Sequence, residues 1–123
     1  KSDPTFEGRV TVPCLWDRVT GRIVSNNYPD LTIDFETQFT RFHAPGAPDL
    51  YPEALRAEID AVNAVVYEDV NNGVYKAGFA TSQAAYERAV SALFARLDGL
   101  EARLAGQRWL VGGQLTEADV RLY

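Results

Sequence analysis

The 123-residue sequence has no methionine, one cysteine, one histidine and no long apolar run. The single cysteine, Cys14, excludes an internal disulfide framework and is typical of a reducing cytoplasm. The single histidine, His43, has no second ligand at a suitable spacing, which argues against a metal site. No stretch approaches the roughly 20 apolar residues that cross a bilayer. A net charge of -5 does not suit nucleic acid or an anionic membrane. We therefore expect a cytoplasmic protein with no metal, no membrane association and no nucleic-acid partner.

Residues 8–24 are predicted to form a β-hairpin. Apolar side chains alternate along Gly8–Trp16, which predicts a strand. Turn residues in Asp17–Arg22 and the apolar pair Ile23–Val24 predict a second strand. Pro13 is unusual inside a strand, because proline lacks the amide donor that a central ladder position uses. Cys14 follows it with no cation nearby, so we interpret it as an unreactive core residue.

Helical spacing dominates the rest of the chain. Leu31–Phe42 fits either a strand or a short helix, and we expect the helix. His43–Pro52 holds three of the six prolines and indicates a linker. Glu53–Val70 and Ser82–Ala105 carry apolar residues at steps of three and four, which predicts two antiparallel helices that begin a bundle. We therefore predict an α/β part over residues 1–42, a linker over residues 43–52 and an all-α part over residues 53–123.

Capping residues mark where these helices begin and end. Thr81 or Ser82 can cap the second long helix, and Gly106 stands just past its predicted end. A third helix follows Thr116, which with Asp119 forms a capping box. The chain stops within two turns of this cap, so we expect it to be an internal piece of a longer protein.

The segment between the two long helices, Asn71–Gln83 (NNGVYKAGFATSQ), is not composed like a simple connector. Short polar turns normally join helices in small domains. Here two glycines, Gly73 and Gly78, occur together with Tyr75 and Phe79, and glycine permits left-handed backbone or close approach. Aromatic residues in a loop indicate packing or the lining of a pocket. We predict a pocket-lining loop with Lys76 pointing to solvent.

NNGVYKAGFATSQ and VTVPCLWD (residues 10–17) resemble the glutathionyl-hydroquinone reductases, an Omega-like family also called Xi-class glutathione transferases. The resemblance implies part of a thioredoxin-like domain followed by the start of a glutathione-transferase-type helical bundle. It also implies a reductase that removes glutathione from S-conjugated hydroquinones through a cysteine nucleophile. The family's nucleophile motif, Cys-Pro-x-x-His-Arg-like, is absent from residues 1–123, so we expect this piece to be inactive alone.

The resemblance also assigns roles to particular residues. Val12 and Pro13 would bind the thiol, because a cis-proline strand in the family offers its backbone to that ligand. Tyr75 would hydrogen-bond a quinol oxygen, since a phenolic hydroxyl both donates and accepts. Phe79 would line or pack the same substrate pocket. The expected partners are small aromatic or quinol conjugates, and the full-length protein is expected to be a homodimer.

Asn27 and Tyr28 depart from the family pattern, which has Glu-Ser at these positions to bind the γ-glutamyl end of glutathione. Asparagine binds an ammonium without charge assistance, which roughly halves the strength of the hydrogen bond. The thiol is therefore either glutathione or one without a γ-glutamyl group, such as mycothiol. A conjugating transferase and a non-catalytic binding module also remain open, and the sequence before Lys1 would discriminate between them.

Overall fold

A computed structural model describes residues 4–123, which form two compact units. One unit ends at Pro45, and the other runs from Gly46 to Tyr123. The division falls within the segment expected to be a linker, residues 43–52, where no helix or strand forms. The first predicted domain, residues 1–42, begins with three residues that lie outside the described part of the chain.

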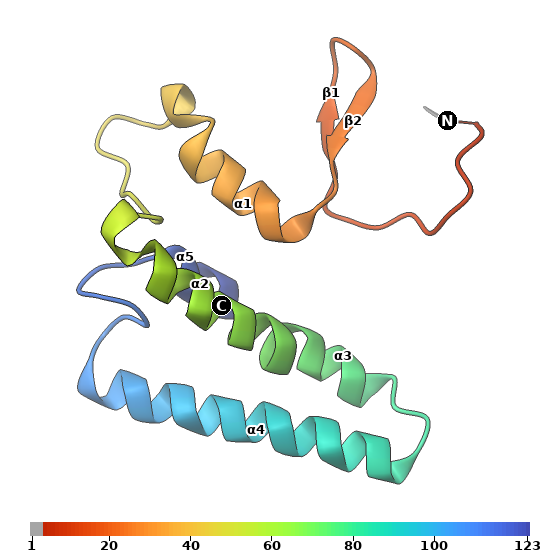
Figure 1. The fold of residues 1–123 in the computed structure, drawn as a ribbon, viewed down its shortest axis with the longest axis vertical. Coiled ribbons are helices and arrows are strands. Elements are labelled where there is room, and N and C mark those ends of the chain that lie inside the picture. Colours follow the sequence, from red (N-terminus) through yellow and green to blue (C-terminus); the bar gives the residue numbers. More distant parts are fainter. Residues whose placement is uncertain (1–3) are drawn as a thin grey trace. The chain divides into compact units, whose positions relative to one another are not determined.

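The first unit contains a β-hairpin followed by helical segments: β1 (Leu15–Asp17), β2 (Arg22–Ser25), α1 (Tyr28–Thr37) and the 3-10 turn η1 (Thr40–Phe42) (Figure 1). The strands pair antiparallel, with Trp16 opposite Ile23. Gly21 has a φ of 66°, and its amide donates to the Asp17 carbonyl at 2.9 Å, closing the turn. The predicted hairpin is confirmed.

The strand predicted over Gly8–Trp16 is wrong for all but its last two residues. Residues 8–14 join no ladder, because only two strands lie among residues 4–123 and Pro13 has no amide to donate. Val12 is 87% exposed and Cys14 is exposed too, so the interpretation of Cys14 as a core residue is wrong. Within the described part of this unit, Leu31 alone is buried.

The helix predicted over Leu31–Phe42 is confirmed in type but not in extent. α1 begins three residues earlier, at Tyr28, and ends at Thr37. Pro29 explains the early start, because a helix's first turn tolerates a residue with fixed φ and no amide. Asn27 precedes the helix as its N-cap residue.

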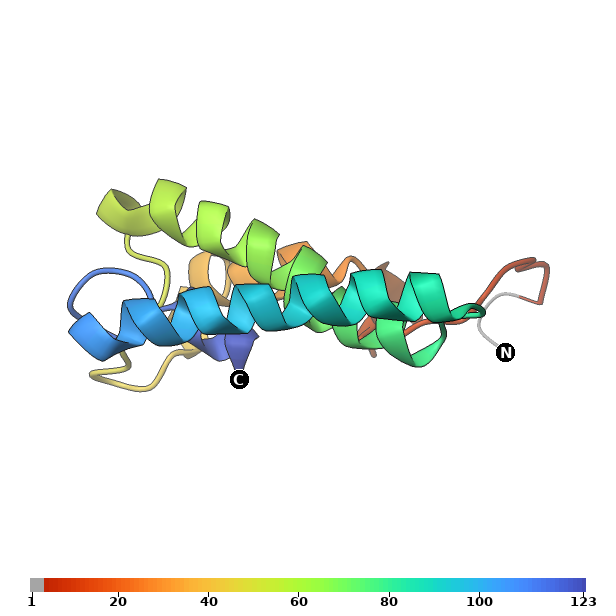
Figure 2. The same ribbon diagram turned by 90° about the horizontal axis from the view of Figure 1, so that it is seen from below.

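The second unit is helical. Its segments are η2 (Glu53–Leu55), α2 (Arg56–Val66), the π-helix η3 (Tyr67–Asn71), α3 (Asn72–Gly78), α4 (Gln83–Gly106) and α5 (Glu117–Leu122). α2, η3 and α3 follow one another without a break, and α4 runs back beside η3 and α3 (Figures 1 and 2). No helix among residues 4–123 is both long and apolar enough to span a membrane.

The loop predicted over Asn71–Gln83 is wrong for most of its length, because Asn72–Gly78 forms α3. Neither Gly73 nor Gly78 has a positive φ, so these glycines do not break the helix. Gly73 is buried, and a Cβ placed on it would lie 3.7 Å from Leu93 Cβ of α4. The π turn of η3 lets the helix continue where the sequence suggested a break, and such turns are frequent at functional sites.

The predicted caps are largely confirmed. Ser82 is the N-cap of α4, and its hydroxyl accepts from the Ala85 amide at 3.2 Å. The capping box of α5 is present, with Asp119 Oδ2 accepting from the Thr116 amide at 2.9 Å. Gly106 is the last residue of α4 rather than the residue after it, because its φ is not positive and no left-handed cap forms there.

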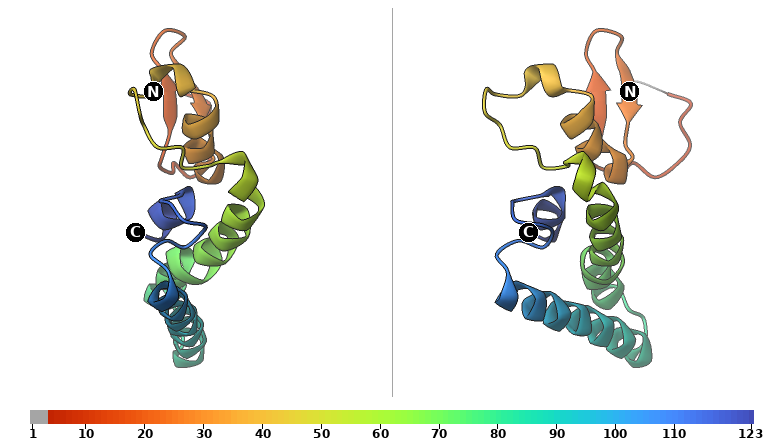
Figure 3. Two further views of the ribbon diagram at one scale, coloured as in Figure 1. Left: turned by 90° about the vertical axis from the view of Figure 1, so that its left-hand side faces the viewer. Right: turned by 60° about the vertical axis from the view of Figure 1, so that its left-hand side comes forward.

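The core of the second unit lies between α2, α4 and α5. Its buried apolar residues are Ile59, Val62, Val66, Leu100, Leu110, Val111 and Ala118. α5 packs against α2 (Figure 3) and carries a buried ion pair, in which Arg121 Nε donates to Glu117 Oε1 at 2.7 Å. The apolar stripe of α4 is only partly covered: Leu93 and Leu100 are buried, whereas Tyr86 is 46% exposed.

Candidate functional site

Tyr75 and Phe79 lie one helical turn apart at the C-terminal end of α3. Their rings are stacked, with centroids 6.3 Å apart and planes at 6°. Tyr75 is 64% exposed and Phe79 is 79% exposed, so most of the surface of both residues is accessible in this chain. The structure thus brings together the two residues that the sequence placed in a substrate pocket, on a helix instead of a loop.

A hollow of ≈ 510 Å³ lies at the turn from α3 to α4. It is lined by residues of the segment from Ala77 to Gln83 and by Tyr86. Neither Tyr75 nor Phe79 is among its lining residues. The aromatic pair therefore does not line this hollow, and Tyr86 is a lining tyrosine that the sequence did not single out as a site residue.

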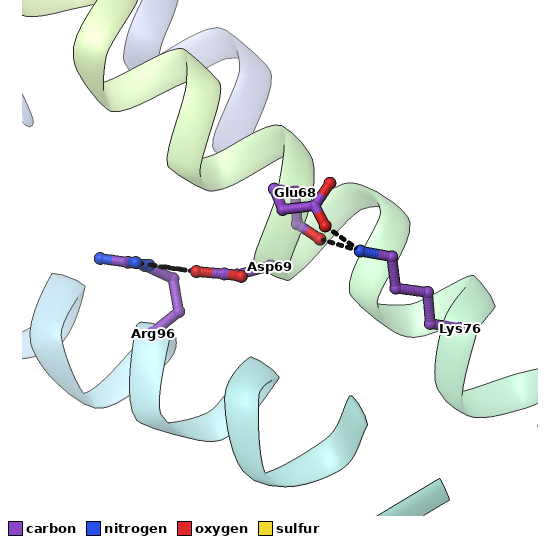
Figure 4. A network of polar contacts seen from close by, with 4 residues as sticks. All are labelled: Glu68, Asp69, Lys76 and Arg96. Atoms are coloured by element: carbon purple, nitrogen blue, oxygen red, sulfur yellow. Dashed lines mark hydrogen bonds and ion pairs between the residues drawn. The ribbon is translucent and has the colours of Figure 1, made fainter. Parts of the chain in front are cut away.

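Two ion pairs lie where η3, α3 and α4 meet (Figure 4). Lys76 forms an ion pair with the Glu68 carboxylate, and its Nζ donates to the Glu68 carbonyl at 3.3 Å. Lys76 is exposed, as predicted, and its ion pair with Glu68 lies at the surface. Asp69 accepts from Arg96 of α4 at 2.8 Å. Sequence reasoning missed these acidic residues because their partners lie eight and 27 positions away.

The thiol-binding candidates lie in the first unit. The Val12–Pro13 peptide bond is cis, as the resemblance implies. Next to it, Thr11 Oγ1 accepts from Asn26 Nδ2 at 3.3 Å, which brings the Val12–Pro13 segment to the start of α1. Asn27 follows at that start, so the structure places these candidates near one another within the unit.

Hydrogen bonds within the chain engage Asn27. Its amide donates to Ser25 Oγ at 3.1 Å, and its side-chain Nδ2 donates to Asp30 Oδ2. Asp30 adds a carboxylate to the first turn of α1. Tyr28, the neighbouring candidate, is the first residue of the helix and is half-buried. The positive end of a helix dipole favours anions, and the Asp30 carboxylate already stands there.

Two other polar side chains of this unit, those of His43 and Asp17, make local contacts. His43 Nε2 lies 2.8 Å from the Phe35 carbonyl. Hydrogen bonds from the Thr20 hydroxyl and the Val19 amide lower the pKa of the Asp17 carboxyl, which stabilises the hairpin turn. Residues 4–123 contain no group of three or more His, Cys, Asp or Glu side chains that could hold a metal ion.

Similarity to known proteins extends over almost the whole chain. The family model described as "Glutathione S-transferase, C-terminal domain" matches residues 83–123. Glutathionyl-hydroquinone reductase PcpF of Sphingobium chlorophenolicum is 52% identical over 123 residues, which are 99% of this chain and 39% of PcpF. The chain thus spans about two fifths of the length of this relative.

Solved structures agree with this relationship. Glutathione transferase Xi 1 of Trametes versicolor is 56% identical and superposes with a TM-score of 0.89, covering 98% of this chain and 42% of the other. The glutathione-bound structure of YqjG, a glutathione transferase homolog from Escherichia coli, is 52% identical with a TM-score of 0.91, covering 98% and 39%.

The hairpin, α1 and the helical unit are therefore part of a glutathione transferase fold. Within that superfamily of enzymes, the chain is similar to a glutathionyl-hydroquinone reductase and to a Xi-class glutathione transferase.

Proposed function

We propose that the full-length protein removes a low-molecular-weight thiol from S-conjugated hydroquinones, and that glutathione is the first candidate for this thiol. The observation that carries the proposal is the 52% identity to a reductase of this name across 99% of the chain. The exposed Tyr75–Phe79 stack supports it, because an aromatic ring of the substrate can pack against such a pair. The glutathione in the YqjG structure supports the choice of thiol.

In the proposed reaction, a cysteine thiolate from outside residues 1–123 attacks the thioether sulfur of the conjugate. The carbon–sulfur bond breaks, the ring carbon takes a proton, and the hydroquinone leaves. Tyr75 donates a hydrogen bond to a quinol oxygen as charge develops on it. A second thiol then attacks the mixed disulfide, which releases a low-molecular-weight disulfide and restores the thiolate.

Val12, Pro13, Asn27 and Tyr28 are proposed to bind the thiol. The Val12 and Pro13 backbone would lie along the extended backbone of a peptide-like thiol and exchange hydrogen bonds with it. We propose the reducing cytoplasm as the site of the reaction, because free thiols are maintained there. A homodimeric full-length protein remains a prediction.

A thiol without a γ-glutamyl group, such as mycothiol, is a second candidate. Asn27 donates to Asp30, so its side chain is already engaged within the chain. The Asp30 carboxylate at the N-terminus of α1 opposes the binding of a second carboxylate there. A thiol whose far end carries neutral hydroxyl groups avoids that repulsion.

The test is an assay of the full-length protein with S-glutathionyl and S-mycothionyl hydroquinone, each with an excess of the matching thiol. The reductase proposal predicts one hydroquinone and one disulfide per turnover. Conjugation of the thiol to an electrophile without hydroquinone release would indicate a transferase instead, and neither reaction would indicate a binding module. The mycothiol candidate requires a higher kcat/KM for the mycothionyl substrate, so equal values would exclude it.

A further inference from the structure

Tyr75 lies on α3, the seven-residue last segment of a helical run that begins at Arg56 and passes through η3. Tyr75 is 64% exposed, and the ring contact recorded for it is the stack on Phe79 of the same turn. The position of that hydroxyl therefore depends on what holds α3 to its neighbours, η3 and α4.

The first turn of α3 is held against α4. Arg96 of α4 donates from Nε and Nη2 to Asp69 Oδ2 at 2.9 and 2.8 Å, so α4 is tied to η3. Charge-assisted hydrogen bonds of this kind are about twice as strong as neutral ones. Gly73 then lets α3 approach Leu93 closely. The last turn of α3, with Tyr75, carries a further charged contact, which Lys76 makes.

Glu68 and Lys76 hold that last turn. Lys76 Nζ pairs with the Glu68 carboxylate and donates to the Glu68 carbonyl at 3.3 Å. Glu68 lies within the π turn η3 and Lys76 lies in α3, so the ion pair joins the two segments. Figure 4 shows Lys76 reaching back to Glu68 while Asp69 faces Arg96.

We propose that Glu68 and Lys76 are positioning residues for Tyr75. Lys76 follows Tyr75 directly in the chain, so a tie between Lys76 and η3 fixes the rotation of the turn that carries the phenol. The stacked ring of Phe79 moves with that turn. The inference rests on the proposed role of Tyr75 in binding the quinol oxygen. It adds that the reaction depends on a surface ion pair that does not touch the substrate.

The experiment compares variants of the full-length protein in the hydroquinone-release assay. Lys76→Gln and Glu68→Gln are each expected to lower kcat about three- to fivefold, the scale of an exposed ion pair. The double variant is expected to be no worse than either single variant, and Lys76→Arg to keep most of the activity. The KM for the free thiol and the unfolding temperature are expected to stay unchanged. Arg103→Gln is the matched control, because it breaks a similarly exposed pair with Glu58 away from Tyr75.

Three results would overturn the inference. One is full activity in both single variants while Tyr75→Phe is impaired. Another is that Lys76→Gln and Glu68→Gln change kcat in opposite directions. The charge of the lysine, and not its contact with η3, would then determine the activity. The third is an equal loss in Arg103→Gln. If Tyr75→Phe is itself fully active, the proposed role of Tyr75 fails.

A readout without substrate separates that failure from a failure of the tie. The Phe79 amide donates to the Tyr75 carbonyl at 2.9 Å, so its hydrogen exchange reports on the last turn of α3. Lys76→Gln and Glu68→Gln are expected to speed this exchange severalfold, and Arg103→Gln to leave it unchanged. Unchanged exchange in all three variants would show that the ion pair does not hold the turn.

Discussion

Tyr51 anchors the chain where the second unit begins. Its hydroxyl donates to Asp60 Oδ1 at 2.8 Å, and its carbonyl accepts from Arg56 Nε at 3.1 Å. The Arg56 guanidinium lies 5.1 Å from the centroid of the Tyr51 ring. Burial raises the pKa of Tyr51 above its ordinary value of 10.0, and the hydrogen bond to Asp60 raises it further. A single phenol thus couples the end of the linker segment to α2.

Tyr51→Phe is expected to lower the free energy of unfolding by about 1 kcal/mol at neutral pH, because one hydrogen bond is lost. The pKa of Tyr51 is raised on folding, so its contribution is fully present below pH 10 and is lost as pH rises through the folded pKa. Denaturant unfolding on both sides of pH 10 is expected to show a steeper alkaline loss in the parent than in the variant. Parallel pH profiles would contradict this.

At the scale of elements, α3 shows what the sequence could and could not predict. The apolar stripe of α4 was predictable because its leucines recur at a helical period. Its N-cap was predictable because serine is a favoured residue at that position. Gly73 and Gly78 suggested a loop because glycine permits left-handed backbone or close approach. The contact of Gly73 with Leu93 and the π turn before it depend on a partner helix far along the chain, which no local pattern reveals.

The same reasoning applies to the first unit. Val10, Val12 and Trp16 alternate as a strand would, but a strand also needs a partner for its ladder. The turn at Asp17–Gly21 was predictable because its hydrogen bonds are local. Of the candidate site, Tyr75 and Phe79 were named from the sequence, whereas Glu68 and Asp69 emerge only from the folded chain.

Two glycines offer a test of this account of α3. Gly78 has no positive φ, and a Cβ placed on it would meet nothing within 4 Å. Gly78→Ala is therefore expected to raise the free energy of unfolding by about 0.5–1 kcal/mol through helix propensity. Gly112 is the contrasting control, because its φ is 62° and a Cβ would lie 2.8 Å from Leu55 Cδ1. Gly112→Ala is expected to destabilise, and denaturant midpoints of both variants check the pair.

α5 depends on the side chain of Asp119. Asp119 Oδ2 accepts from the Thr116 amide at 2.9 Å and from the Thr116 hydroxyl at 3.1 Å. Asp119 Oδ1 accepts from the amide of Leu110, a fully buried residue, at 2.8 Å. The carboxylate therefore joins the helix cap to the core segment before it.

Asp119→Ala is expected to lower the free energy of unfolding by about 2–3 kcal/mol, because it removes the cap and leaves the Leu110 amide without its partner. Thr116→Ala keeps the Leu110 bond and is expected to lose about 1 kcal/mol. Chemical denaturation of the two variants provides the measurement. An equal loss in both would show that the bond to Leu110 contributes nothing.

At the scale of the whole molecule, the chain supplies two groups of candidate residues, each within its own unit. The first unit holds the cis Val12–Pro13 segment and Asn27, and the second holds the Tyr75–Phe79 stack. We propose that the first group binds the thiol and that the second group binds the aromatic ring. Of these proposed roles, that of Tyr75 is chemically the most specific, because it requires a hydrogen bond to a quinol oxygen.

The most direct test is the kcat of Tyr75→Phe in the full-length protein with its S-thiolated hydroquinone, with Tyr86→Phe measured beside it. Tyr86 lines the neighbouring hollow and has no assigned role. We expect Tyr75→Phe to lower kcat at least about tenfold, since one donor to a developing oxyanion is lost. The KM for the free thiol and the unfolding temperature are expected to be unchanged. An active Tyr75→Phe variant beside an impaired Tyr86→Phe variant would contradict the assignment.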